Sequence, residues 1–361
     1  MEQTALTYLC PDCMAYLRYD GKEQKWVCDY CGGKFTREEL EQRGTETKQD
    51  DYEVKPRAEA AENTAEISYH YEENITETDE DLSHLRAYHC PSCGGEIVTD
   101  DVTAATFCVF CGNPTILPTQ LEGEYRPSAI LPFETDKEDA RKAFLQLCKG
   151  KRLLPKGYTS EQRLEKITGV YVPFWLFDCK ADFDYHATGE NVITWSDTRF
   201  IYTKTDLYHI HRAGTMEFEN IPLDASEKMQ DNLMDALEPF HLEKKKPFDM
   251  SYLSGFLAEK RDIEQDAAKQ SMVTEAKGYA ERMFTSVENP YNTLTGRAKF
   301  EPDSVKTKYL LLPAWVLTYK HRADGEPYYY MMNGQTGRIC GKLPINKGKL
   351  YAVGALIGGI V

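Results

Sequence analysis

The sequence predicts an α+β protein, built from two small cysteine-rich β modules followed by a larger α+β domain. Three observations carry this prediction. The cysteine spacing C-x2-C-x14-C-x2-C occurs twice, eighty positions apart. An acidic segment that is poor in large apolar residues separates the two copies. A tryptophan-containing apolar motif then occurs twice in the remaining chain, each time after a stretch with helical spacing.

The repeated spacing is typical of a four-thiolate metal site. The first copy consists of Cys10, Cys13, Cys28 and Cys31, and the second of Cys90, Cys93, Cys108 and Cys111. Two cysteines three apart on a tight turn supply two corners of a tetrahedron, and a second such turn supplies the other two. We therefore expect two zinc ions in closed sites with a structural role. Iron in a site of the same spacing is an alternative. Disulfides are disfavoured, because the opening MEQTALTY has neither the basic start nor the apolar core of a signal peptide.

The first module, residues 1–44, should be a β-hairpin followed by a short helix. Asp20-Gly21 is a hairpin turn signal, so the strand Lys25–Val27 should return the chain to the second cysteine pair. Glycines follow three of the four cysteine turns, whereas Met14 follows Cys13. Because glycine tolerates positive φ, the Met14 turn should be strained or differently shaped.

Residues 45–84 should form an acidic, flexible linker, since they lack the apolar surface needed to offset chain entropy. Before the linker, the capping box Thr36–Glu39 should start the short helix. After the linker, residues 85–118 should form the second module. In it, Glu96–Thr99 should pair with Ala105–Phe107 as a hairpin.

Both modules resemble the zinc-ribbon superfamily, which includes ribbons of transcription factors, RNA polymerase subunits and ribosomal proteins. The resemblance covers about Leu9–Leu40 and His89–Leu117. It implies a metal-holding β fold but not one function, because ribbons serve many roles.

The larger α+β domain is expected at residues 119–345 and contains an internal match. Val172-Pro173-Phe174-Trp175-Leu176 is mirrored 140 residues later by Leu312-Pro313-Ala314-Trp315-Val316. Helical spacing precedes each motif, from Thr135 to Gly150 and from about Ile263 to Val287. These matches predict an internally duplicated α+β unit.

Candidate chemistry outside the cysteine modules is sparse. His209 and His211 alternate on an expected strand and so share one face. A metal site needs a third ligand, which the sequence does not nominate, so a solvated strand face is the preferred interpretation. Cys148, Cys179 and Cys340 are expected to remain free thiols, the first two as packing residues.

The charge and the absent motifs limit the function classes. The net charge of −15 and the pI near 5.1 argue against binding to nucleic-acid phosphates, which requires clustered Lys and Arg. Neither cysteine module carries a basic stripe. The sequence also lacks the glycine-rich nucleotide loops and the serine-hydrolase elbow.

Residues 346–361 predict the start of a transmembrane helix. Lys342, Lys347 and Lys349 lead into an uncharged run from Leu350 to Val361. This order would keep the preceding domains at the cytoplasmic face of the cell membrane. The run spans about 18 Å as a helix, against about 30 Å for the hydrocarbon core, so the helix would have to continue. A buried or frayed peptide is the alternative.

The whole pattern resembles bacterial membrane-associated proteins that carry TFIIB-type zinc ribbons. These proteins pair such ribbons with a tryptophan-containing α+β region and a C-terminal membrane segment. Besides the two ribbons, the matching stretches are YVPFWLFDC, LMDALEPF, YLSGFLAEKRD, LPAWVL and NGQTGRICGKLP. Relatives are sometimes labelled as primosomal helicases, but this sequence lacks the nucleotide loop that a helicase requires.

The sequence therefore predicts a zinc-stabilised, non-enzymatic adaptor at the cytoplasmic membrane face. It would hold a protein partner through its ribbons or its aromatic sheet. One alternative is a nucleic-acid-binding ribbon protein, which salt-dependent binding to DNA or RNA would reveal. The other is an enzyme with an unrecognised site in the α+β domain. A deep pocket holding His209 or His211 near a carboxylate would indicate that alternative.

Overall fold

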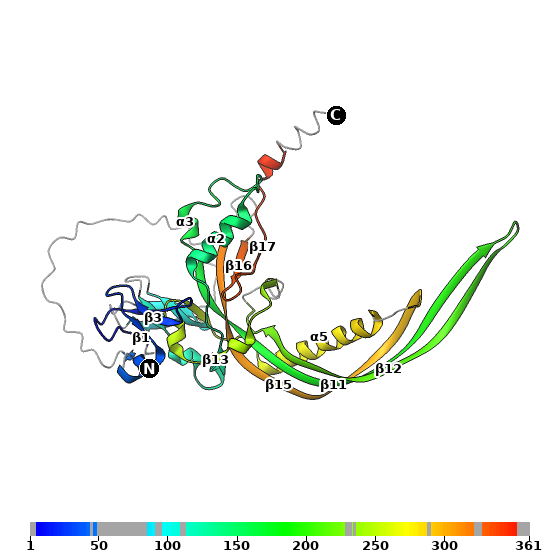
Figure 1. Cartoon of the computed structure of the whole chain (residues 1–361), viewed down its shortest axis with the longest axis horizontal. Helices are drawn as coiled ribbons and strands as arrows, with labels where there is room; N and C mark the ends of the chain where they lie inside the picture. The colour runs from blue at the N-terminus through cyan, green and yellow to red at the C-terminus, as the bar shows by residue number, and fades with distance from the viewer. Residues whose placement is uncertain are drawn as a thin grey trace. The chain divides into compact units, whose positions relative to one another are not determined.

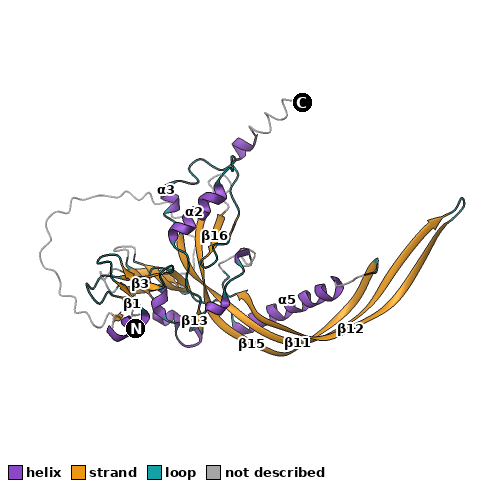
Figure 2. Cartoon of the chain, in the orientation of Figure 1, coloured by secondary structure: helices purple, strands orange, loops and turns teal. Residues whose placement is uncertain are grey.

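The computed structural model confirms the predicted α+β class, with both helices and extensive strands (Figures 1 and 2). It describes residues 5–43, 46–48, 85–90, 96–108, 113–227, 233, 236–286, 290–320 and 327–351. The chain forms two compact units. Unit 1 comprises Met1–Glu124 and Met250–Glu259, and unit 2 comprises Tyr125–Asp249 and Lys260–Val361.

The described residues of unit 1 form short strands and one short α-helix. The strands are β1 (Leu6–Tyr8), β2 (Leu17–Asp20), β3 (Lys25–Cys28), β4 (Lys34–Phe35), β5 (Glu46–Lys48), β6 (Leu85–His89), β7 (Glu96–Asp100), β8 (Thr103–Phe107), β9 (Pro114–Ile116) and β14 (Leu257–Glu259). The helix is α1 (Arg37–Arg43), and the 3-10 turns η3 (Pro118–Leu121), η4 (Gly123–Tyr125) and η6 (Met250–Leu253) complete the list.

The first cysteine module, residues 1–44, which we call the first ribbon, has the hairpin that its sequence predicts. Strands β2, β3 and β4 form an antiparallel sheet in which Asp20 lies opposite Lys25, so the hairpin turn is where the Asp-Gly pair places it. The capping box of α1 is also present. The Thr36 backbone N–H donates to Glu39 Oε2 at 2.8 Å, and the Glu39 N–H donates to Thr36 Oγ1 at 3.4 Å.

A distant segment packs against the first ribbon within unit 1. The Trp26 indole N–H donates to the backbone carbonyl of Ser251 at 2.8 Å. The rings of Tyr19, Trp26 and Tyr252 lie in mutual contact, with centroids 5.0 to 5.2 Å apart. Residues 250–259 therefore belong with the ribbon, although the sequence assigned them to the larger domain at 119–345.

The second cysteine module, residues 85–118, which we call the second ribbon, differs from the predicted hairpin. Strand β7 does not pair with β8; β7 pairs with β6 instead, and β8 pairs with β9 and β14. Asp100 turns the chain sharply between β7 and β8, since its side chain accepts hydrogen bonds from the Thr103 N–H and hydroxyl. Strand β5 also lies inside the predicted linker and pairs with β1. The other residues predicted for the linker, 45 and 49–84, lie outside the described residues.

In its described residues, unit 2 contains three long strands, several short strands, and helices that include α2 and α5. Its strands are β10 (Ala129–Ile130), β11 (Thr168–Ser196), β12 (Ile201–Asp224), β13 (Lys246–Pro247), β15 (Thr293–Lys320), β16 (Pro327–Asn333) and β17 (Ile339–Gly341). Its helical elements are α2 (Lys137–Cys148), α3 (Glu161–Leu164), η5 (Leu242–Lys244) and α5 (Gln265–Ser286).

The two tryptophan motifs lie on adjacent antiparallel strands. In the β11–β15 register, Val172 faces Leu312, the first residues of the two motifs. The order helix, long strand, antiparallel partner strand occurs as α2–β11–β12 and again as α5–β15–β16. Each indole N–H also donates to the segment before the helix of the other copy: Trp315 to Thr135 Oγ1 before α2, and Trp175 to the Ile263 carbonyl before α5, both at 3.0 Å. This equivalence supports the predicted internal duplication.

Helix α5 covers one face of the sheet formed by β11, β12 and β15 (Figure 2). Phe183, Tyr185 and Ala187 of β11 point to this face and form a buried cluster with Ala280 of the helix. Successive strand residues point to opposite faces. Asp184, His186 and Thr188 therefore lie on the face away from α5.

Beyond Glu190, β11 and β12 continue as a two-stranded ribbon past the end of β15 (Figure 1). We call residues 191–206 the arm. Exposed large apolar side chains gather on it: Val192, Ile193, Trp195, Phe200, Ile201 and Tyr202. No described strand pairs with the outer edge of β12, so its backbone donors and acceptors face outward along the arm.

The prediction of a transmembrane helix at the end of the chain is wrong. No helix among the described residues is long and apolar enough to cross a membrane. The described part of residues 346–361 is a short helical segment at 347–351, preceded by a cap in which the Lys349 N–H donates to Asn346 Oδ1. Residues 352–361 lie outside the described part of the chain.

Candidate metal centre

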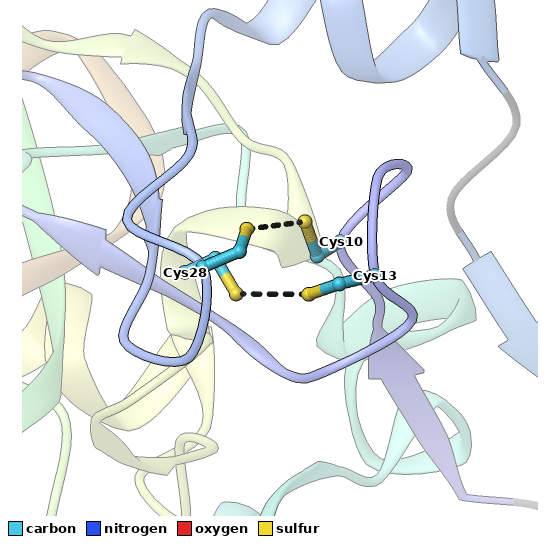
Figure 3. A group of neighbouring side chains, drawn as sticks. Cys10, Cys13 and Cys28 are labelled. Carbon is cyan, nitrogen blue, oxygen red and sulfur yellow. Dashed lines mark hydrogen bonds between the residues drawn. The ribbon is translucent and has the colours of Figure 1, made fainter.

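The cysteine turns of the first ribbon bring four sulfur atoms together. Cys10 Sγ lies 3.6 Å from Cys31 Sγ, and Cys13 Sγ lies 3.5 Å from Cys28 Sγ. Figure 3 shows Cys10, Cys13 and Cys28 converging from the two loops. Four sulfurs around one zinc at 2.3 Å would be separated by about 3.8 Å. A disulfide requires about 2.05 Å. The observed spacing therefore fits a tetrahedral metal site, and the four cysteines could hold one metal ion.

The surroundings of Cys10 and Cys28 shift the pKa values of their thiols in opposite directions. Burial raises the pKa of the Cys10 thiol, because desolvation disfavours the thiolate. Desolvation also acts on Cys28, but the backbone N–H groups of Cys31 and Tyr30 donate to its sulfur and lower its pKa overall. Backbone donors directed at a sulfur stabilise the thiolate, which is the form that binds metal.

The two turns of the first ribbon have the same shape but different residues. Met14 has φ of 61° and Gly32 has φ of 75°, each one residue after the second cysteine of its pair. The prediction of a strained turn at Met14 is confirmed, because this left-handed conformation is costly for any residue with a Cβ atom. The backbone N–H of Met14 donates to the Cys10 carbonyl, and that of Gly32 donates to the Cys28 carbonyl, both at 2.9 Å.

We expect Met14→Gly to stabilise the first ribbon by up to about 1 kcal/mol, because glycine removes the left-handed strain of this exposed turn. The reciprocal change Gly32→Ala should destabilise it by about 1 kcal/mol. A Cβ atom at Gly32 would meet nothing within 4 Å, so that effect is purely conformational. The urea concentration at which the first ribbon releases its metal measures the effect of both substitutions. Equal effects of the same sign would contradict the interpretation that positive φ strains the Met14 turn.

The second ribbon is described only in part. Cys90 and Cys108 are buried together with Ile97 in one apolar cluster. Cys93 and Cys111 lie outside the described residues. The structure thus brings one cysteine of each predicted pair into the same cluster.

The remaining cysteines are free thiols in the structure, as the sequence predicts. Burial raises the pKa of Cys179, and it raises the pKa of Cys148 and Cys340 to about 11. A thiol that stays protonated at neutral pH is a poor nucleophile and a poor metal ligand. The interpretation of Cys148 and Cys179 as packing residues is consistent with this environment.

Two residues that the sequence did not nominate, Asp184 and His186, lie beside His211. Its Nε2 lies 2.7 Å from Asp184 Oδ1, and His186 Nε2 lies 3.1 Å from the same oxygen. The hydrogen bond from His211 is the main cause that lowers the pKa of Asp184. His209 lines the same groove but does not belong to this cluster. The available signal was the spacing Asp184-x-His186, which alternates on β11 as His209-x-His211 does on β12.

These side chains do not form the deep pocket that the enzyme alternative requires. The groove beside them is lined from β11, β12 and β15. His186, His211 and Asp184 expose 68%, 57% and 46% of their side chains. Charges that are this accessible to water interact weakly, so the arrangement alone does not favour acid–base chemistry.

Comparison with known proteins identifies a relative. The chain is 32% identical to the protein named "Uncharacterized protein YdjG" from Bacillus subtilis (strain 168), with 74% of this chain and 92% of the relative covered. No family model matches the chain. No solved structure matches it either.

Proposed function

This chain belongs to the family of the Bacillus subtilis protein YdjG, and we propose that it is a zinc-stabilised, non-enzymatic adaptor. The observation that supports this most is the arm, which presents apolar side chains and an unpaired strand edge. Large exposed apolar patches on soluble proteins mark contact sites for other molecules.

Zinc supplies the stability of the ribbons in this proposal. Cys10, Cys13, Cys28 and Cys31 provide four thiolates and leave no open position, which is the donor set of a structural zinc. Cys90, Cys93, Cys108 and Cys111 have the same spacing and would hold a second zinc. Small β modules of this size depend on such an ion because they bury little apolar surface.

The arm is unusual as a purely structural element. An isolated two-stranded ribbon is marginally stable in water, and this one also exposes Trp195 by 50% and Ile201 by 78%. Its charges are few and mixed, although the chain as a whole carries −15. A surface that is apolar, nearly neutral and edged by free backbone groups suits strand addition by another polypeptide.

The charges on the outer edge of β12 favour a second copy of this chain as that polypeptide. Antiparallel pairing of two β12 edges about Thr205 places Lys204 opposite the partner's Asp206, and Asp206 opposite the partner's Lys204. The same register places Tyr202 opposite the partner's Tyr208. Shifting the centre to Lys204 or Asp206 would place like charges opposite each other, which is destabilising. The edge is therefore self-complementary in the register centred on Thr205.

Pairing through the arms would give the adaptor two copies of every other surface. A partner with two matching sites would then bind far more tightly than to one copy, because its second contact is intramolecular. This bivalence is the adaptor activity that we propose.

Charge exchange on β12 tests the proposal. The purified chain should be a dimer by light scattering, and Lys204→Asp and Asp206→Lys should each weaken self-association by about tenfold or more, because two like-charge pairs replace two attractive ones. An equimolar mixture of the two variants should form a heterodimer by native mass spectrometry, since opposite charges again face each other.

A matched control is present on β15. Lys299 and Glu301 form an exposed ion pair at 2.7 Å with the same spacing as Lys204 and Asp206. Lys299→Asp and Glu301→Lys should leave the dimer unchanged. A monomeric wild-type chain, or variants that fail to recover when mixed, would overturn pairing through the arm.

A further inference from the structure

Three side chains of ligand type converge on the sheet face that α5 leaves uncovered. We infer that Asp184, His186 and His211 form a second kind of metal site, which takes one divalent transition-metal ion. Both imidazole Nε2 atoms lie within 3.1 Å of the same carboxylate oxygen. The three ligand atoms all lie within 4.8 Å of one another.

Strand register produces this convergence. His186 of β11 lies directly opposite His211 of β12, and their rings stack with centroids 4.2 Å apart and planes 11° apart. Asp184 lies two residues before His186 and so projects from the same face. The opposite face is fixed by Phe183 and Tyr185, which pack in the buried cluster beneath α5. The ligands therefore project from a supported sheet, and a site on rigid strands is better ordered than one on loops.

The donor set selects the class of ion. Two imidazole nitrogens and one carboxylate oxygen suit zinc, nickel, copper or iron(II), whereas magnesium and calcium prefer oxygen ligands alone. Ligands around a tetrahedral zinc are about 3.3 Å apart for bond lengths near 2.0 Å, so small side-chain rotations would admit the ion. Three protein ligands leave further positions open, and the adjoining groove has a volume of about 510 Å³. The site would exchange its ion more readily than four thiolates.

Positive charges on the same face would limit the affinity. Arg297 of β15 lies opposite His186 on the other side of β11, and Lys299 lies opposite Asp184. The ammonium of Lys299 is paired with Glu301, and His209 lines the groove beside His211. Arg297 is therefore the residue whose removal should raise metal affinity.

Calorimetric titration of zinc into the full chain tests the site. The protein is first loaded with zinc at its cysteines, freed of excess metal by gel filtration, and checked for metal content. One further zinc per chain should bind. His186→Asn and His211→Asn should each weaken this binding by about 100-fold or more, since two ligands seldom hold zinc. Arg297→Gln should tighten it by about fivefold, because one like charge is removed.

His209→Asn is the matched control, because it changes a histidine on the same face of the same strand, outside the cluster. It should alter the affinity by less than about twofold, since it removes no ligand. Unchanged circular dichroism of every variant excludes loss of fold. Absence of a further zinc, or equal losses in the His209 and His211 variants, would overturn the site.

Discussion

Replacing Cys28 by serine should remove one of the two cysteine-bound zinc ions from the purified chain and unfold the first ribbon. Its sulfur lies 3.5 Å from that of Cys13 and completes the four-thiolate cluster. Structural zinc contributes about 10 to 16 kcal/mol in small zinc-finger domains, so loss of a ligand exceeds what three short strands can compensate. Elemental analysis of zinc per chain measures the first effect, and hydrogen exchange across residues 5–43 measures the second.

Cys340→Ser is the control for this experiment, since that thiol lies outside the cluster. The control protein should keep both zinc ions and its exchange protection. A Cys28→Ser protein that keeps the full zinc content of the wild-type chain would contradict the ligand assignment. A wild-type chain with fewer than two zinc ions, or with the red colour of a rubredoxin-like iron site, would contradict the proposed metal content.

Trp26→Ala should destabilise unit 1 by about 3 to 5 kcal/mol, the usual cost of deleting a fully buried aromatic side chain. Only 2% of Trp26 is exposed, its ring contacts Tyr19 and Tyr252, and its N–H bonds the Ser251 carbonyl. The change removes both the ring contacts and the hydrogen bond that joins residues 225 positions apart. The urea concentration at which the first ribbon releases its metal is the measurement.

A second substitution at Trp26 separates the contribution of its hydrogen bond from that of its ring, and a substitution at Trp195 serves as the control. Trp26→Phe keeps a ring but loses the hydrogen bond, and should cost about 1 to 2 kcal/mol. Trp195→Ala removes the half-exposed tryptophan of the arm and should leave the midpoint of metal release within error, because Trp195 belongs to unit 2. Similar midpoints for the Trp26 and Trp195 variants would show that residues 250–259 do not brace the ribbon.

The features that sequence predicts well are those fixed by neighbours along the chain. Cysteine spacing predicts the first sulfur cluster because each pair is held by one tight turn. The capping box at Thr36 predicts the start of α1 because its two hydrogen bonds span three residues. The strain at Met14 follows from the comparison of one turn with the other three.

Most of the structural features that the sequence did not predict depend on contacts between residues that are distant in sequence. Alternation identifies β7 and β8 as strands, but it does not reveal that β8 pairs with β14, about 150 residues later. His211 similarly finds its neighbours Asp184 and His186 only through the β11–β12 register. The transmembrane prediction rested on apolar composition at the end of the chain, and composition does not fix the length of a helix.

The pairing of β11 with β15 has a consequence during synthesis of the chain. Glu190 faces Thr293, so this edge of β11 leaves the ribosome about 100 residues before the strand that will cover it. At about 5 to 20 residues per second, that edge and the apolar face beside it stay uncovered for about 5 to 20 s. The β11–β12 hairpin can form in microseconds. It would therefore stand without β15 for most of that interval. Chaperone contact with the nascent chain should therefore be concentrated on β11 and end when α5 and β15 emerge.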